Sequence, residues 1–126
     1  MASNPSSSEI GHSRRRAALA SELAGELSDM EKHCGVRLCK GHQRLVPLTR
    51  EISNETIEDQ ELHERREYHG GAWVEIRIGH QGSDWDALVL VTSSVCDTES
   101  VQIPQGQATE PATKLVRSIC LRTFEA

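Results

Sequence analysis

The clearest pattern in the chain is an alternation of apolar and polar residues in the segment AWVEIRI, residues 72–78. Apolar side chains occupy every second position: Ala72, Val74, Ile76 and Ile78. The positions between them hold Trp73, Glu75 and Arg77. A period of two places these two sets on opposite faces of an extended chain, so the segment predicts a half-buried strand.

Two further strands and a helix follow this segment. WDALVLVT, residues 85–92, predicts a more buried strand, and SVQIP, residues 100–104, predicts a short one that ends at Pro104. The segments GHQGSD and SSVCDT supply the turns between them. Beyond Pro111, apolar residues recur at the spacing of one helix face: Ala112, Leu115, Val116, Ile119, Cys120 and Phe124. The pattern predicts a three-stranded antiparallel sheet with this helix packed across its apolar face.

The first half of the chain has a weaker pattern. Residues 1–13 are polar and predict a disordered arm. Residues 14–32 predict a helix, because Leu19, Leu23, Leu27 and Met30 fall at helical spacing. Residues 54–68 are polar and rich in acids, and they predict either a second exposed helix or an acidic linker.

The predicted fold is therefore α+β, in the order α-α-β-β-β-α. Residues 14–126 form one domain, with a helical, Cys/His-containing part at 14–69 and a βββα part at 70–126. The length of 126 residues fits a single domain.

Charge is distributed unevenly along the chain. The net charge is −5, yet residues 1–50 carry eight Lys/Arg against five Asp/Glu, while residues 51–70 carry two against seven. A protein that binds polyanions through its overall charge is basic, so a nucleic-acid role here requires a local basic surface. There is no apolar secretory segment and no run long enough to span a membrane, so we expect a soluble intracellular protein with reduced cysteines.

The decapeptide HCGVRLCKGH, residues 33–42, favours two kinds of chemistry. Zinc is bound by four thiolate or imidazole groups, which short glycine-containing loops can bring together. Candidate ligands are Cys34, Cys39 and His42, with His33 as a fourth. The simpler interpretation is small buried thiols beside exposed histidines.

The second interpretation of this region is a phosphate-binding surface, because Arg and Lys side chains suit phosphate oxygens. The basic residues in question are Arg14, Arg15, Arg16, Arg37, Lys40 and Arg44. A solvated surface neutralised by the acidic segment that follows is the alternative. Trp73 and Arg77 join the nucleic-acid candidates from the polar face of the first strand, where the tryptophan would stack on a base, form a dimer interface or lie under a helix. No arrangement of nucleophile, base and oxyanion donors is evident, so we expect no enzyme activity.

The strand–strand–helix order in DALVLVT and SVQIPQGQATEPATKLVRSICLRTF resembles the C-terminal part of the small RNA-silencing suppressors of tombusviruses and aureusviruses. The resemblance covers residues 72–124 in pattern. It implies a homodimer that binds double-stranded RNA across a β-sheet. The paired tryptophans with which that family caps duplex ends from an N-terminal helix are absent, because Trp73 and Trp85 lie in predicted strands.

Together these observations predict a small non-enzymatic regulatory protein that binds double-stranded RNA through a basic surface. The resemblance further implies that the protein is a viral suppressor of RNA silencing and acts as a homodimer. We expect it in the cytoplasm and also in the nucleus. The alternative is a protein-interaction module, with a structural zinc ion in the Cys/His-rich stretch.

Overall fold

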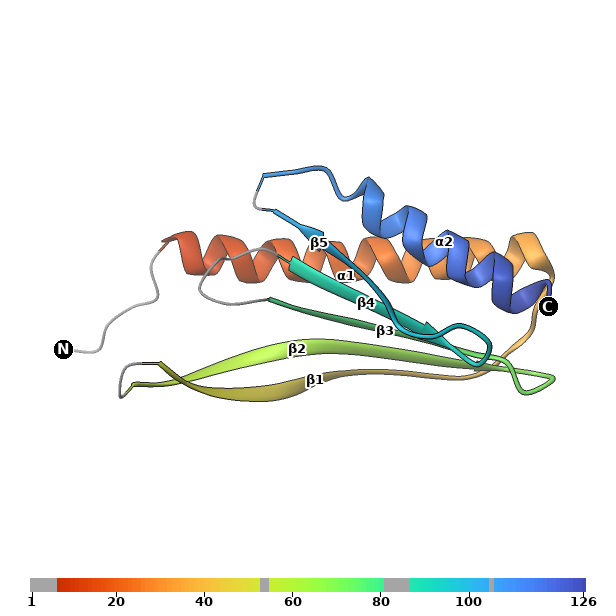
Figure 1. Ribbon diagram of the computed structural model, residues 1–126, viewed down its shortest axis with the longest axis horizontal. Helices are drawn as coiled ribbons and strands as arrows, with labels where there is room; N and C mark the ends of the chain where they lie inside the picture. Colours follow the sequence, from red (N-terminus) through yellow and green to blue (C-terminus); the bar gives the residue numbers. More distant parts are fainter. Residues whose placement is uncertain (1–6, 53–54, 81–86, 105) are drawn as a thin grey trace.

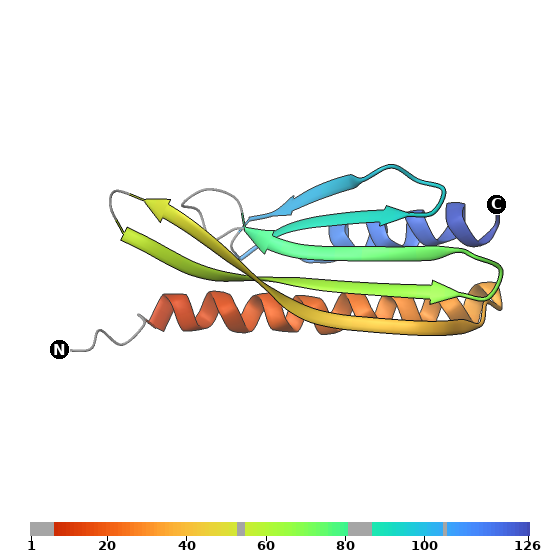
Figure 2. The same ribbon diagram turned by 90° about the horizontal axis from the view of Figure 1, so that it is seen from below.

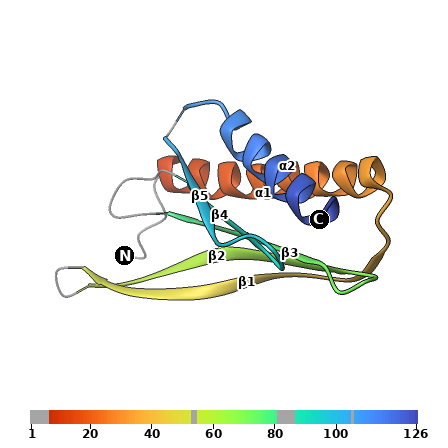
Figure 3. The same cartoon turned by 45° about the vertical axis from the view of Figure 1, so that its right-hand side comes forward.

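All five strands of the sheet follow one another along the chain, and each pairs antiparallel with the next in the order β1-β2-β3-β4-β5. The computed structural model describes residues 7–52, 55–80, 87–104 and 106–126, and the side chains of 17–44, 62–79, 87–104 and 106–126. The elements are α1 (Ser7–Cys34), β1 (Leu38–Ile52), β2 (Glu55–Tyr68), β3 (Trp73–His80), β4 (Ala87–Ser93), β5 (Glu99–Ile103) and α2 (Glu110–Phe124). Both helices lie on the same side of the sheet, which gives two layers (Figures 1 and 3).

The core lies between these two layers. It is built from the apolar half of the strand alternation and the apolar faces of both helices. The buried residues include Leu19, Leu23, Leu27 and Met30 of α1, Val74, Ile76 and Ile78 of β3, Val89 and Val91 of β4, and Ala112, Val116, Ile119 and Cys120 of α2. The α+β class, the strands β3, β4 and β5 and the packing of α2 on the sheet therefore agree with the prediction. The sheet itself has five strands rather than three.

The N-terminal helix is longer than its apolar pattern indicated. α1 begins at Ser7 rather than Arg14, so it takes in the second half of the segment predicted as a disordered arm. Its apolar stripe starts only at Leu19, where packing on the sheet begins, and the turns before it carry no such signal.

The largest correction concerns residues 38–68. Residues 54–68, expected to be a helix or linker, contain strand β2, and the Cys/His decapeptide leads into strand β1. The two strands pair along their whole length, from Leu38 opposite Tyr68 to Ile52 opposite Glu55. β2 then pairs with β3 over residues 62–67. The order is thus α-β-β-β-β-β-α, and tertiary pairing overrides the helix-favouring spacing of the charges in β2.

A buried ionic network explains how so polar a strand can face the core. Arg66 of β2 points toward α1, where its Nη1 donates to Ser28 Oγ at 2.8 Å and to Glu31 Oε2 at 2.9 Å. Its Nη2 lies 2.9 Å from Oε1 of Glu64, and the Tyr68 hydroxyl donates to Glu31 Oε2 at 2.7 Å. The charged positions on this face of β2 are thereby paired with each other and with the helix.

Neither described helix is long and apolar enough to cross a membrane.

Candidate nucleic-acid interface

One face of the sheet carries no helix among the described elements, as the view from below shows (Figure 2). We call this the open face. Strand register and burial assign alternate residues to it, because Val74, Ile76 and Ile78 are buried under the helices and their neighbours point the other way. The residues of the open face are Lys40, His42 and Arg44 of β1, His63, Arg65 and Glu67 of β2, Trp73, Glu75 and Arg77 of β3, Leu88, Leu90 and Thr92 of β4, and Ser100 and Gln102 of β5.

Among the residues whose side chains the structure describes, the formal charge of the open face has the opposite sign to the net charge of the chain. Four of its described residues are Lys or Arg, two are Glu, and two are His, which gives a formal charge of +2 with neutral histidines. The whole chain carries −5. The cations lie on β1, β2 and β3, whereas β4 contributes Leu88, Leu90 and Thr92. The face is therefore divided into a cationic half and a neutral half.

The turn between β2 and β3 places Trp73 at the end of the cationic half. Gly70 and Gly71 both have positive φ, of 96° and 92°, which suits glycine and lets the chain reverse direction. The backbone of Trp73 is fixed by Ser94, the residue after β4, because its N–H donates to Ser94 Oγ at 3.2 Å and its carbonyl accepts from Ser94 N at 3.0 Å. The guanidinium of Arg65 lies over the indole, with Cζ 4.2 Å from the ring centre, in a cation–π contact.

A chain of polar contacts continues from Arg65 across the sheet. Arg65 Nη1 donates to Glu75 Oε2 at 2.9 Å, and its Nε donates to Glu67 Oε1 at 3.3 Å. The bond to Glu75 is the main reason why the pKa of Arg65 is raised. His63 Nε2 lies 2.9 Å from Glu75 Oε1, but it is not aligned for a hydrogen bond, so this contact is electrostatic. Arg44 Nε completes the chain through a long hydrogen bond of 3.4 Å to His63 Nδ1.

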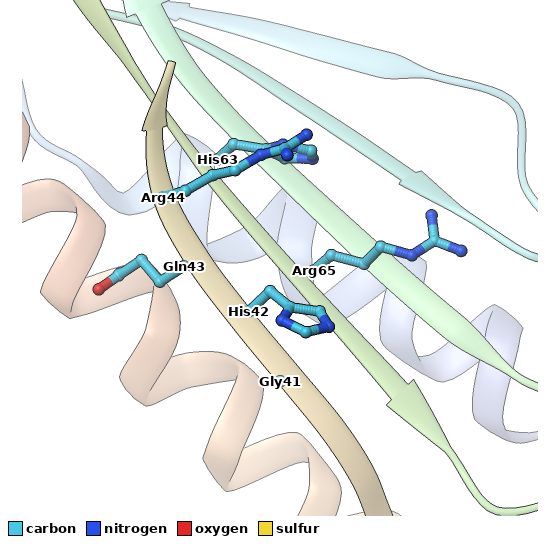
Figure 4. A pocket seen from close by; sticks show the side chains of 6 residues that line it. All are labelled: Gly41, His42, Gln43, Arg44, His63 and Arg65. Carbon is cyan, nitrogen blue, oxygen red and sulfur yellow. The ribbon is translucent and has the colours of Figure 1, made fainter.

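A shallow hollow lies over β1 and β2 beside this chain of contacts (Figure 4). Its volume is about 510 Å³, and it is lined by Gly41, His42, Gln43, Arg44, His63 and Arg65. Arg44 lies alongside His63, and Gln43 points away toward α1. The side chains around the hollow are thus those of two arginines and two histidines, with no carboxylate among the described lining residues. Such a lining suits an anionic group such as phosphate.

The structure divides the nucleic-acid candidates predicted from the sequence. Lys40, Arg44, Trp73 and Arg77 lie together on the open face. Arg37 is exposed in the connection between α1 and β1. Arg14, Arg15 and Arg16 lie on α1, in the helical layer, and their side chains lie outside the described residues. Of the predicted contacts, those on β1 and β3 therefore share one face of the sheet, and β2 adds Arg65 to it.

The predicted metal ligands are not brought together. Cys34 ends α1 and packs against the core, Cys39 is exposed at an irregularity in the β1–β2 pairing, and His42 lies on the open face. His33 is exposed on α1. Within the described part of the chain no three His, Cys, Asp or Glu residues form a group that could hold a metal ion. The four candidate ligands are separated because the decapeptide spans a helix end, a turn and a strand instead of forming one loop.

Burial raises the pKa of two of the four thiols, those of Cys34 and Cys120. Burial, followed by the charges of Cys34 and Glu31, raises the pKa of Cys120 to about 12. Burial, followed by the charge of Glu125, also raises the pKa of Cys34. A raised pKa disfavours the thiolate, which is the form that binds metals and attacks electrophiles.

His63, Arg65 and Glu75 are parts of the open face that sequence reasoning missed as site residues. The signal was the alternation in LHERREY, residues 62–68, where His63, Arg65 and Glu67 occupy every second position. That alternation was hidden because two of the core-facing positions hold Glu64 and Arg66 rather than apolar residues.

No protein-family model, no curated protein and no solved structure matches this chain.

Proposed function

We propose that this protein is a non-enzymatic regulatory protein that binds double-stranded RNA on the open face of its sheet, mainly through phosphate contacts. The observation that carries the proposal is the formal charge of +2 on the described part of the open face, in a chain whose net charge is −5. Four strand cations, Lys40, Arg44, Arg65 and Arg77, lie on this uncovered surface, and such a cluster produces a local field that attracts polyanions.

The composition of the open face favours a duplex over a single strand. Proteins that bind single strands stack successive bases on several aromatic side chains. Trp73 is the one aromatic residue of the described open face, whereas Lys40, Arg44, Arg65 and Arg77 supply cations on three adjacent strands. Cations spread over a sheet contact phosphates without reading base identity. The resemblance of residues 72–124 to viral silencing suppressors supports RNA as the nucleic acid, and it is the sole support for a viral role in silencing.

The protein is further proposed to act as a homodimer. In support of this, β5 is at one edge of the described sheet and has a neighbouring strand on one side only. Edge strands with unpaired backbone groups readily pair with another strand. A hollow of about 400 Å³ beside this edge is lined by apolar and uncharged residues and by Glu110: Gln102, Ile103, Pro104, Gln107, Ala108, Glu110 and Pro111. Light scattering should give twice the mass of one chain, and the mass of a single chain would contradict the dimer.

The binding proposal is tested by fluorescence anisotropy with a short RNA duplex over a range of salt concentrations. Affinity should fall linearly with the logarithm of salt concentration. The double variant K40A/R44A should bind more weakly, with a slope shallower by about one for each lost phosphate contact. Lys114→Ala is the matched control, because Lys114 is a similarly exposed cation on α2 in the helical layer. An equal loss of affinity in the control, or no binding of the duplex by the native protein, would contradict the proposal. The second result would leave the protein-interaction module as the remaining interpretation.

A further inference from the structure

Glu75 is a negative charge in the middle of a surface proposed to bind a polyanion. Its side chain is 22% exposed, against 41% for Glu67, the other carboxylate of the open face. A partly enclosed carboxylate at such a place works against RNA binding by its charge alone. Its presence suggests a role other than surface charge.

Both oxygens of Glu75 are engaged with cationic or ionisable neighbours. Oε2 accepts from Arg65 at 2.9 Å, and Oε1 faces His63 Nε2 at 2.9 Å. Burial works to raise the pKa of Glu75, but the bond from Arg65 and the neighbouring His63 outweigh it, so the pKa is lowered. The carboxylate therefore stays ionised at neutral pH and keeps both contacts.

Each of these neighbours is held by a second group as well. The other face of Arg65 lies on Trp73, and His63 Nδ1 accepts from Arg44 Nε. Arg44, His63 and Arg65 are three of the residues that line the hollow over β1 and β2 (Figure 4). Glu75 does not line the hollow itself, but it contacts both His63 and Arg65, which do.

We propose that the hollow over β1 and β2 is a subsite for one phosphate group of the RNA backbone, and that Glu75 is the positioning residue that fixes His63 and Arg65 in its wall. The inference rests on the proposed function. Arg65 uses Nε and Nη1 for Glu67 and Glu75, which leaves its Nη2 amino group to donate to the phosphate. Arg44 and His42 line the β1 side of the hollow.

Preorganisation is the physical reason for such an arrangement. A free arginine or histidine side chain loses rotamer freedom when it is fixed by a ligand, which weakens binding. Glu75 and Trp73 fix Arg65 before the ligand arrives, so less freedom is lost on binding. The smaller loss of side-chain freedom strengthens binding, whereas repulsion between the carboxylate and the phosphate weakens it. The effect on side-chain freedom must be the larger of the two for Glu75 to favour binding.

The two effects predict opposite signs for the substitution Glu75→Gln. If charge alone matters, removing a carboxylate tightens RNA binding. If Glu75 positions the subsite, Glu75→Gln weakens binding, because a neutral amide holds Arg65 and His63 less firmly than a carboxylate does. Glu67→Gln is the matched control, since it removes the same charge from the same face but breaks only the 3.3 Å contact with Arg65 Nε.

The experiment measures anisotropy of a labelled short RNA duplex with native protein, Glu75→Gln and Glu67→Gln at several salt concentrations. We expect Glu75→Gln to weaken binding about fivefold or more, within the usual range for a coupling of this kind, and to make the salt slope shallower by about one. Glu67→Gln should bind as tightly as native protein or more tightly. Equal or tighter binding by Glu75→Gln overturns the inference while leaving the proposed function intact.

Two further arms separate the remaining outcomes. Absence of duplex binding by the native protein, at any salt concentration, overturns the proposed function and the subsite with it. Arg65→Lys keeps the charge but lacks the forked, stacking guanidinium, so it tests the subsite even if Glu75→Gln does not fold. Positioning predicts that Arg65→Lys weakens binding, and unchanged affinity in this variant overturns the inference.

Discussion

Arg66 provides the strongest test of how this fold is stabilised. Its guanidinium lies between β2 and α1 and contacts two carboxylates, Glu31 and Glu64, together with Ser28 Oγ and the carbonyl of Ala24. The side chains of Arg66, Glu31 and Glu64 are 13%, 14% and 10% exposed, so water screens these contacts poorly. The substitution Arg66→Met keeps much of the side-chain volume and removes the cation.

The expected loss is large because two enclosed carboxylates lose their common partner. Removing one member of a buried ion pair costs about 3–5 kcal/mol, mainly through the charge left behind. A domain of this size is stable by about 5–15 kcal/mol in total. Arg66→Met should therefore lower the free energy of unfolding by roughly a fifth or more, and the melting temperature should fall clearly.

The measurement is urea-induced unfolding at neutral pH, followed by far-ultraviolet circular dichroism. Arg122→Met is the matched control, because Arg122 of α2 forms an ion pair of 2.6 Å with Glu99 of β5 in which the two side chains are 49% and 43% exposed. Its unfolding free energy should stay close to that of the native protein, as for other surface pairs. A loss below about 1 kcal/mol for Arg66→Met, the size of a surface pair, would refute the idea that the network holds α1 on β2.

Three other predictions follow from burial. Leu27→Ala should cost about 3 kcal/mol in chemical unfolding, because Leu27 is fully buried in α1, whereas Leu38→Ala, at a 45% exposed position, should cost less than about 0.5 kcal/mol; equal losses would contradict the assigned core. With a thiol reagent at mildly alkaline pH, the exposed Cys39 should react first, and Cys120, whose pKa is about 12, should react only when the protein unfolds. Mass spectrometry measures the order of labelling, and early labelling of Cys120 would contradict its buried position in the core. Tyr68 is the single tyrosine, and burial together with its bond to Glu31 raises its pKa above the value in the unfolded chain. Phenolate absorbance should therefore appear only with unfolding, and the free energy of unfolding should fall as the pH rises above about 10. Ionisation of Tyr68 in the folded protein near pH 10 would refute the raised pKa.

The sequence predicted the parts of the fold in which apolar residues mark one face. β3, β4, β5 and α2 each present apolar side chains to the core at a regular period, so their patterns were readable. β1 and β2 were not readable, because β2 faces the helices with Glu64 and Arg66, whose partners come from α1. A pairing between groups 35 residues apart leaves no trace in a local pattern.

The candidate site was predicted in part for the same reason. Lys40, Arg44, Trp73 and Arg77 were proposed as contacts from their residue types, and the register of the sheet places them on one face. Arg65 and Glu75 belong to that face only once β2 is known to be a strand between β1 and β3. The metal ligands were proposed from proximity in sequence, which in an extended strand sends adjacent residues to opposite sides.

The two-layer arrangement has a consequence for how the protein can change during evolution. Trp73, Glu75 and Arg77 of β3 lie on the open face, whereas Val74, Ile76 and Ile78 are buried under the helices, so neighbouring residues are under different selective constraints. Substitutions at Trp73, Glu75 or Arg77 can retune ligand preference while Val74, Ile76 and Ile78 keep the interior unchanged. Strand β2 lacks this independence, because Arg65 and Arg66 are adjacent in the chain. A shift of one residue in the register of β2 would place Arg65 against α1 and Arg66 on the open face.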